Sequence, residues 1–222
     1  MSQKTAAIIG ASGLIGSEIL AILKHDQEYE TIRLIVRWPV TDSHPKIEMK
    51  LVNFEDYESL KLAIDGCDVV FCAVGTTQKK VKGDKLAYRK VDYDIPVNAA
   101  QACLETKCEH FLLVSSVGAN AQSNNFYLKL KGDVEDAIQK ISIPSISIFR
   151  PSVLLGRRKE SRIGERIGQA LMNVVSPLLG GKQSKYKPIA ARDVAAAMIK
   201  AAKKRERGYH VYEYQDIKQH LA

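Results

Sequence analysis

Apolar positions follow two different patterns along this chain. Short runs are almost wholly apolar and end at turn residues, which is typical of strands buried on both faces of a parallel sheet. The predicted strands are residues 6–9, 31–36, 47–52, 69–74, 110–114 and 145–149. Between them, apolar residues recur every three or four positions, as on helices with one buried face. The alternation predicts an α/β fold, a doubly wound parallel sheet with strand order 3-2-1-4-5-6.

The helical segments and the tail complete the expected architecture. The predicted helices are residues 14–24, 57–64, 86–105, 125–141 and 163–175, and a further one ends near Lys204. Pro96 should kink the third helix or begin a new segment. Residues 209–214 could add a seventh strand. We expect one domain over residues 1–222, in which residues 152–222 form a small C-terminal helical extension on the substrate side and not an independent domain.

Composition narrows the class of protein. The chain has 222 residues, of which 45% are apolar, enough for a full core. No apolar run reaches the length of a membrane span, and a strand begins within a few residues, where a signal peptide would stand. The four cysteines form no C-x-x-C pair and the five histidines are scattered. We therefore expect reduced thiols, no metal site and a cytoplasmic location.

The net charge of +8 could attract nucleic acid, a membrane or a phosphorylated ligand. The densest basic run, residues 200–207, ends a predicted helix, where cations complement the helix dipole. No nucleic-acid motif accompanies this run, so no nucleic-acid partner is expected. A protein partner or a second copy of the chain stays open.

Three glycines spaced three apart separate the first predicted strand from the first predicted helix. A helix N-terminus has unpaired N–H groups and a partial positive charge, which suit a pyrophosphate. Gly10 can make the tight turn, Gly13 lets the phosphates approach, and Gly16 lets the helix pack on the strand. We predict a dinucleotide-binding loop in a Rossmann-type fold; the alternative is a glycine turn without a ligand. The loop residues are Gly10, Ser12, Gly13, Leu14, Ile15 and Gly16.

Arg37 stands where the second predicted strand ends, and no acidic residue stands beside it. An acidic residue there would hold the 2′-hydroxyl of NAD, whereas an arginine suits the 2′-phosphate of NADP. NADP(H) is therefore preferred over NAD(H), and the alternative is a surface arginine without a ligand. Ala73, Val74 and Gly75 end the fourth strand, where small residues let a ribose pass close to the backbone.

Tyr127 and Lys131 stand four positions apart on a predicted helix, which places both side chains on one face. The same spacing recurs at residues 57–61 and 214–218, so it has little weight alone. Position distinguishes the pair, because its helix follows the strand that ends in Ser115-Ser116. Ligands of open parallel sheets lie beyond the carboxyl ends of the strands, so these side chains would meet there. The alternatives are a surface pair and a serine that caps a strand.

Four motifs in chain order resemble the short-chain dehydrogenase/reductase superfamily. They are Gly10…Gly13…Gly16, Val114-Ser115-Ser116, Tyr127…Lys131 and Arg150-Pro151-Ser152, all within residues 1 to about 155. The short C-terminal region, Arg37 and the segment 127–135 make the chain similar to the atypical branch of this superfamily. Within that branch it resembles the Tat-interacting-protein oxidoreductases, which bind NADPH.

The resemblance implies hydride transfer between NADP(H) and a small carbonyl or alcohol substrate. Tyr127 would be the general acid/base, while Lys131 would favour the tyrosinate and bind the nicotinamide ribose. Ser116 would hold the substrate oxygen, and Ser115 is the less favoured candidate. The further cofactor contacts implied are Asn53 and Phe54 at the adenine, Ser115, Tyr127 and Lys131, and Pro151 and Val153 at the carboxamide.

Two other functions stay open. One is a protein that senses NADPH and regulates a partner with little or no catalysis. The other is a sugar-nucleotide epimerase or dehydratase, which is disfavoured because only about 70 residues follow Pro151. Eleven positions from Ser116 to Tyr127 leave a compact substrate wall, and Gly132 fits close packing of the helix that carries Lys131.

Overall fold

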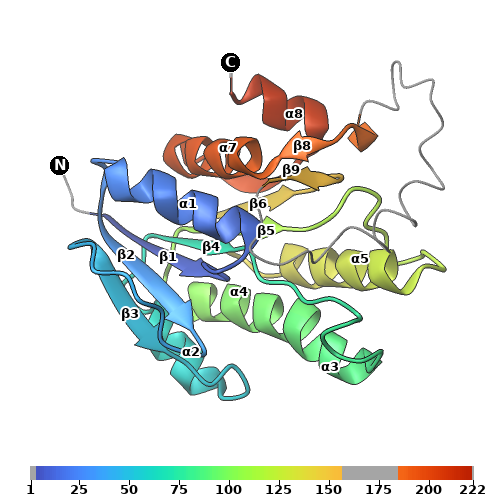
Figure 1. Cartoon of the computed structure of the whole chain (residues 1–222), viewed down its shortest axis with the longest axis horizontal. Coiled ribbons are helices and arrows are strands. Elements are labelled where there is room, and N and C mark those ends of the chain that lie inside the picture. Colours follow the sequence, from blue (N-terminus) through green and yellow to red (C-terminus); the bar gives the residue numbers. More distant parts are fainter. Residues whose placement is uncertain (1–3, 157–184, 222) are drawn as a thin grey trace.

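Seven parallel strands form one sheet with helices on both faces (Figure 1). The computed structural model describes residues 4–156 and 185–221. The strand order β3-β2-β1-β4-β5-β6-β9 confirms the predicted doubly wound sheet, and β9 at its edge is the seventh strand expected from residues 209–214. The bounds are β1 Lys4–Ile9, β2 Tyr29–Val36, β3 Ile47–Leu51, β4 Val69–Cys72, β5 His110–Val114, β6 Ser145–Phe149 and β9 Gly208–Tyr212.

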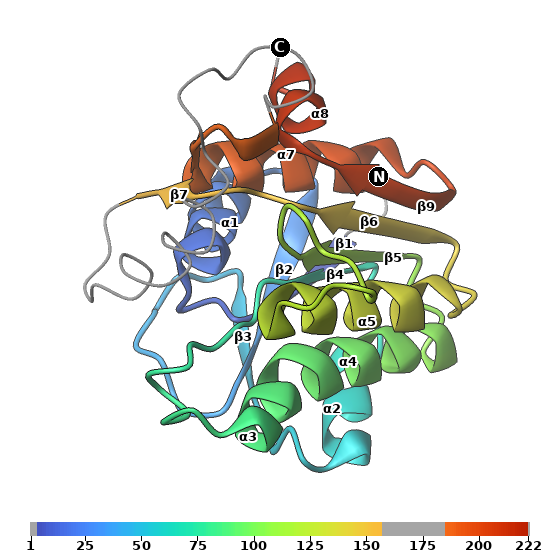
Figure 2. The same ribbon diagram turned by 90° about the vertical axis from the view of Figure 1, so that its right-hand side faces the viewer.

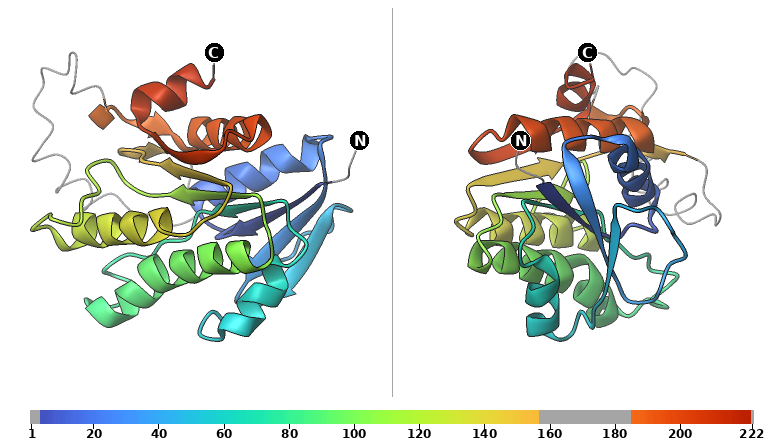
Figure 3. Two further views of the ribbon diagram at one scale, coloured as in Figure 1. Left: turned by 180° about the vertical axis from the view of Figure 1, so that it is seen from behind. Right: turned by 90° about the vertical axis from the view of Figure 1, so that its left-hand side faces the viewer.

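Two layers of helices cover the sheet, as the side and rear views show (Figures 2 and 3). Helices α1 and α7 pack on one face together with the short α8, and α2, α4 and α5 pack on the other. The bounds are α1 Leu14–His25, α2 Tyr57–Ile64, α3 Lys85–Arg89, α4 Ile95–Glu105, α5 Phe126–Gln139, α7 Ala191–Lys204 and α8 Tyr214–Gln219.

Alternate residues of each central strand enter two separate cores. In β1, Ala6 and Ile8 face α1 and α7, whereas Ala7 and Ile9 face α2 and α4. All four are fully buried, which is why this strand has no polar face in the sequence. Because the strands are parallel, their carboxyl ends meet at one edge, where ligands of such sheets bind.

The third predicted helix consists of three consecutive pieces. A π-helical turn, η1 Lys90–Asp94, joins α3 to α4. Pro96 lies in the first turn of α4, directly after the π-helical turn. The predicted new segment at Pro96 is confirmed. Single π turns inside helices are rare and occur frequently at functional sites. The side chains of η1 are therefore candidates for a functional role.

The C-terminal part differs in detail from the prediction. Strand β9 ends at Tyr212 because Glu213 forms a capping box with Asp216, which begins α8. That helix was not expected, and neither was the two-stranded sheet of β7 Leu154–Leu155 and β8 Ile189–Ala190. The predicted helix 163–175 lies outside the described residues.

Cys67, Cys72, Cys103 and Cys108 are free, buried thiols. Burial raises the pKa of Cys67 and of Cys72 to about 12, so these thiols are poor nucleophiles. Within residues 4–156 and 185–221, no group of three or more His, Cys, Asp or Glu side chains could hold a metal ion. No helix in these same ranges has the length and apolar character needed to cross a bilayer.

Candidate functional site

The glycine loop lies between β1 and α1 at the carboxyl edge of the sheet. Gly10 has a φ of +91°, and a Cβ there would stand 2.7 Å from the Ala73 carbonyl oxygen. A Cβ on Gly16 would collide with the Gly10 carbonyl, and the Gly13 N–H donates to that same carbonyl at 2.9 Å. Side chains are therefore excluded where β1, β4 and the start of α1 meet, which leaves backbone close to any ligand.

The start of α1 has neither a side-chain cap nor an acidic residue, whereas α7, which also lacks a side-chain cap, has Asp193 in its first turn. By contrast, the side chains of Asp56, Asp84 and Asn125 cap α2, α3 and α5. Uncapped N–H groups and the positive end of the helix dipole suit an anion. A pyrophosphate therefore fits this loop, where Ser12 is exposed, Leu14 is half-buried and Ile15 is buried.

The other predicted nucleotide contacts stand at the ends of neighbouring strands. Arg37 is exposed directly after β2 and makes no hydrogen bond or ion pair with any other described residue. Asn53 is exposed after β3, and its side-chain oxygen accepts the N–H of Glu55 at 3.1 Å. Phe54 packs against the core between the sheet and α2. After β4, Ala73 and Val74 are half-buried and Gly75 is exposed.

Helix α5 places Tyr127 and Lys131 on one face, as the four-residue spacing predicts. The Lys131 Nζ lies 5.9 Å from the centre of the Tyr127 ring. The Asn125 side chain accepts the N–H groups of Tyr127 and Leu128 at 3.0 and 3.1 Å, which fixes where the helix begins. Tyr127 is half-buried, whereas Lys131 is only 4% exposed.

Asp92 is a residue of this site that the sequence analysis missed. Its Oδ1 lies 3.0 Å from the Lys131 Nζ, and both side chains are almost wholly buried. Burial disfavours the ammonium, but the attraction of Asp92 and Tyr127 outweighs it and raises the pKa of Lys131. A signal was present: Asp92 shares the buried helical spacing of Tyr88, Ile95 and Ala99, where a carboxylate is out of place.

The same carboxylate holds the end of β4. The Asp92 Oδ2 accepts the N–H of Thr76 at 2.7 Å, and the Tyr88 hydroxyl donates to the Thr76 carbonyl at 3.2 Å. The segment that follows Gly75 is thus fixed on both sides by the α3–η1 region. Lys131 and the end of β4 are therefore parts of one connected arrangement.

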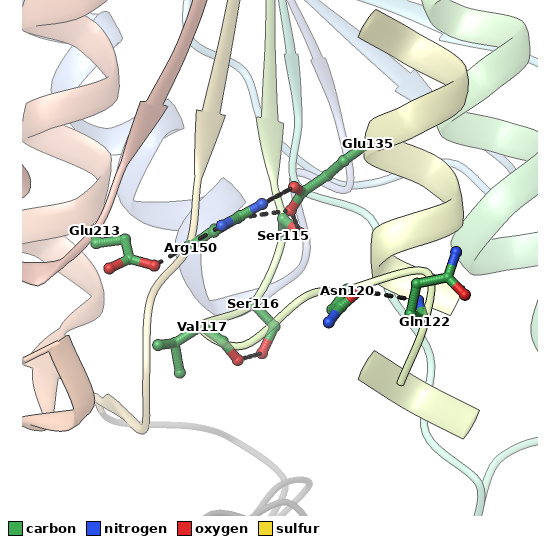
Figure 4. A network of polar contacts seen from close by, with 8 residues as sticks. All are labelled: Ser115, Ser116, Val117, Asn120, Gln122, Glu135, Arg150 and Glu213. Atoms are coloured by element: carbon green, nitrogen blue, oxygen red, sulfur yellow. Dashed lines mark hydrogen bonds and ion pairs between the residues drawn. The ribbon is translucent and has the colours of Figure 1, made fainter. Parts of the chain in front are cut away.

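The two adjacent serines after β5 differ in their hydrogen bonds (Figure 4). The Ser115 hydroxyl donates to Glu135, which is also held by the Arg150 guanidinium, with Nε 3.1 Å from each carboxylate oxygen. The Ser116 hydroxyl has only a long contact of 3.4 Å, to the carbonyl of Val117. Ser115 is therefore committed to a buried ion pair, whereas Ser116 retains a donor for another acceptor.

The loop between Ser116 and Tyr127 is fixed to α5. Lys129 Nζ donates to the Ala121 carbonyl at 2.7 Å, and the Asn120 N–H donates to the Leu128 carbonyl at 3.0 Å. A Cβ on Gly132 would collide with the backbone of Asn120 and Ala121, which explains the glycine inside the helix.

The end of β6 joins the same loop. The Pro151 carbonyl accepts the Val117 N–H at 3.0 Å, so the segments after β5 and β6 are held together. Pro151 is buried and Val153 is half-buried. The structure therefore brings Ser116, Pro151 and the start of α5 to one edge, which β1 and its glycine loop share.

Comparisons with known proteins agree with this geometry. The family model described as NAD(P)H-binding matches residues 10–205. Protein HTATIP2 of Rattus norvegicus is 35% identical over 168 residues, which cover 74% of this chain and 69% of the relative. The mitochondrial protein FMP52 of Candida albicans is 35% identical over 202 residues, which cover 89% of this chain and 87% of the relative.

Solved structures share the fold at low identity. The enzyme WbmH of Bordetella bronchiseptica in complex with NAD+ gives a TM-score of 0.73 at 16% identity, with 98% of this chain and 79% of that chain covered. MoeE5 in complex with UDP-glucuronic acid and NAD gives 0.71 at 16% identity, with 94% and 75% covered.

The relatives correct one prediction and confirm another. The expected cytoplasmic location is wrong by this comparison, because FMP52 relatives from several fungi are named as mitochondrial proteins. The resemblance to the atypical short-chain dehydrogenases/reductases is confirmed, since both a relative and the family model support it. This chain belongs to the NAD(P)H-binding family.

Proposed function

We propose that this protein is an NADP(H)-dependent oxidoreductase that acts on a small carbonyl or alcohol substrate. One observation carries the proposal: the buried ammonium of Lys131 lies beside Tyr127 at the edge where the dinucleotide loop ends. A buried, charged lysine is costly unless it has a partner, and functional sites are where such groups concentrate.

The cofactor-binding residues divide the dinucleotide between them. The loop of Gly10, Gly13 and Gly16 would hold the pyrophosphate at the open start of α1. Arg37 would bind the 2′-phosphate of NADP(H), since its exposed guanidinium has no partner among the described residues. When bound, the nicotinamide supplies or accepts the hydride. The remaining contacts are Asn53 and Phe54 at the adenine, Ala73, Val74 and Gly75 at a ribose, and Pro151 and Val153 at the carboxamide.

Protons would move at the Tyr127 hydroxyl. In reduction it gives its proton to the carbonyl oxygen of the substrate, and in oxidation it takes a proton from the alcohol. The Lys131 ammonium stabilises the tyrosinate by its charge. Ser116 donates a hydrogen bond to the same substrate oxygen, a role closed to Ser115 by its bond to Glu135.

Cofactor binding tests the first half of the proposal. We expect NADPH to bind more tightly than NADH in a fluorescence titration of the purified protein. Arg37→Glu should weaken NADPH binding about tenfold or more, because it replaces an ion pair by a repulsion, and should leave NADH binding unchanged or tighter, because an acidic residue there can hold the 2′-hydroxyl. Arg207→Glu, at the amino edge of the sheet, is the charge-matched control. Equal binding of both cofactors by the unaltered protein would contradict the role of Arg37.

Turnover tests the second half. NADPH should be consumed with at least one member of a panel of small aldehydes and ketones. Tight NADPH binding without turnover, and a Tyr127→Phe variant with unchanged properties, would instead favour an NADPH-binding regulatory protein. A sugar-nucleotide substrate stays the less favoured candidate; the match with MoeE5 covers 94% of this chain and 75% of that chain.

A further inference from the structure

The carboxylate of Asp92 has an unusual surrounding for an acidic side chain. Asp92 is 1% exposed and projects from the π-helical turn η1. Its two oxygens face two different donors, the Lys131 ammonium at 3.0 Å and the Thr76 N–H at 2.7 Å. These donors belong to α5 and to the segment after β4, which are far apart in the sequence. A single buried side chain therefore connects two walls of the site.

The remaining contacts show how tightly this connection is enclosed. A Cβ on Gly75 would lie 3.5 Å from the Asp92 Oδ1, so the strand end packs directly on the carboxylate. The Thr76 carbonyl is held by the Tyr88 hydroxyl. Thr76 thus has both backbone groups bound by residues of one helical region. Asp92 connects this region to Lys131 of α5 by an ion pair, and the Tyr88 ring packs edge-on against Phe126 of α5 with the ring centres 5.7 Å apart.

We propose that Asp92 is a positioning residue that fixes the Lys131 ammonium relative to the end of β4. The inference rests on the proposed function for its purpose, because the ammonium and this strand end would contact the same cofactor. Three N–H donors are present on an ammonium, and Asp92 uses one. The other two stay free to point at a ribose hydroxyl and at Tyr127, in a direction that the bond to Asp92 determines.

Asparagine cannot replace this carboxylate. Both positions that surround the Asp92 oxygens are donors, and an amide offers one acceptor oxygen and one NH₂ donor. In Asp92→Asn the one acceptor oxygen turns to the charged Lys131 ammonium, the stronger donor, and the NH₂ group is set against the Thr76 N–H, although the size of the side chain is unchanged. Asp94→Asn, on the same π-helical turn, makes the same chemical change at a half-buried side chain and is the matched control.

Hydrogen exchange of the Thr76 amide, measured by NMR without cofactor, tests the connection directly. We expect protection in the unaltered protein and in Asp94→Asn, and at least about tenfold faster exchange in Asp92→Asn. Unchanged exchange in Asp92→Asn would overturn the proposal. The measurement needs no cofactor, so it decides about Asp92 even if NADPH did not bind and the proposed function failed.

The pH dependence of NADPH binding separates positioning from simple packing. Without Asp92, burial is left as the dominant influence on Lys131, so its ammonium loses a proton at lower pH. The affinity of Asp92→Asn should therefore fall about tenfold between pH ~7.5 and ~9.5, a range above the titration of the phosphate. The unaltered protein and Asp94→Asn should show a flat profile. A flat profile for Asp92→Asn would overturn the proposal.

Other titratable groups around Lys131 are accounted for in that range. Cys72 on β4 and Tyr88 on α3 both have a pKa raised by burial, so both stay neutral. Tyr127 on α5 is the remaining group that faces the ammonium. Repeating the profile in a Tyr127→Phe background removes its contribution, and the difference between Asp92→Asn and the control should persist.

The double variant D92N/K131M covers the case in which Asp92→Asn alone does not fold. It leaves no unpaired charge in the core, and the amide oxygen can face the Thr76 N–H because no ammonium competes. Protection of the Thr76 amide should return to that of the unaltered protein, while NADPH affinity stays low because the lysine donors are lost. Fast exchange of this amide in the folded double variant would overturn the proposal.

Discussion

Two of the three tyrosine–lysine pairs with the same spacing, those of α2 and α5, have a similar geometry but differ in the burial of the lysine and in its partners. In α2 the Lys61 Nζ lies 5.8 Å from the centre of the Tyr57 ring, and in α5 the Lys131 Nζ lies 5.9 Å from that of Tyr127. The Lys61 side chain is 29% exposed, with Glu58 at 2.9 Å. The Lys131 side chain is 5% exposed.

The difference shows what a tyrosine–lysine pair needs, besides its four-residue spacing, to act as the proposed catalytic pair. An exposed lysine shares its charge with water and with mobile surface carboxylates, so it acts weakly on a neighbouring hydroxyl. Lys131 has one buried counter-ion, Asp92, and little competition from solvent. Its charge and direction are therefore defined, and it stands where the glycine loop and Ser116 also end. Burial and a fixed partner, more than residue spacing, separate the two pairs.

The largest expected effect tests this separation at the hydroxyl groups. Tyr127→Phe should lower the rate of NADPH consumption with an active carbonyl substrate by about 100-fold or more, because the proton donor is lost. Tyr57→Phe should leave the rate within about twofold, since Tyr57 contributes no reacting group. Steady-state assays of both variants with one substrate provide the measurement. A comparable loss of rate in both variants would show that the pair on α5 has no catalytic role that the pair on α2 lacks.

The second test concerns stability. Lys131→Met leaves the Asp92 carboxylate buried without its counter-ion, so the free energy of unfolding should fall by about 3 kcal/mol. Lys61→Met is the control with the same change at a surface pair, and its unfolding should match that of the unaltered protein. Urea unfolding at neutral pH measures both. A stable Lys131→Met variant would mean that Asp92 finds another way to satisfy its charge.

The residue after each lysine gives a third, smaller contrast. Leu62 is 70% exposed, whereas Gly132 lies against the backbone of Asn120 and Ala121. Gly132→Ala must push this loop away from α5, at an expected cost of about 2 kcal/mol in the free energy of unfolding. Gly75→Ala is the control, since its Cβ would make an ordinary contact. Equal thermal unfolding of the two variants would show that the loop yields easily.

Much of the fold was predictable because it depends on local patterns. Strands buried on both faces must be apolar throughout, and the two-layer arrangement follows from their alternation with helices. The order 3-2-1-4-5-6 follows from right-handed crossovers. The glycine loop was equally readable, because Gly10 and Gly16 stand where no side chain fits. In these cases the fold imposes a steric requirement that only a few residue types meet, so the residue types in the sequence reveal it.

The polar connections of the site were not predictable in the same way. The pairs Asp92–Lys131 and Glu135–Arg150 join residues that are distant in the chain, so no spacing reveals them. The choice between Ser115 and Ser116 likewise depends on which hydroxyl Glu135 occupies. A sequence shows which side chains are available, but their pairing depends on how two helices approach the sheet.

A buried histidine extends the comparison, because it has no counter-ion among the described residues. His110, at the start of β5, is 3% exposed, and its Nε2 lies 2.9 Å from the Ser147 Oγ. Burial, aided by the positive charge of Arg205, lowers the pKa of His110 to about 4. Lys131 keeps its charge because Asp92 lies beside it, whereas His110 stays neutral at neutral pH.

This neutrality predicts a pH dependence of stability. The unfolded chain binds a proton at His110 near pH ~6.5, whereas the folded protein does so only near pH 4. Stability from the neutral histidine is therefore fully present above pH ~6.5 and is lost as the pH falls toward 4. His110→Gln should flatten the fall in urea midpoint over this interval, and His25→Gln, at an exposed position, should not. An unchanged slope in His110→Gln would show that the folded protein accepts a buried charge at His110 without a counter-ion. A fixed partner would then not be what a buried charge requires, and the explanation given for the difference between Lys61 and Lys131 would fail.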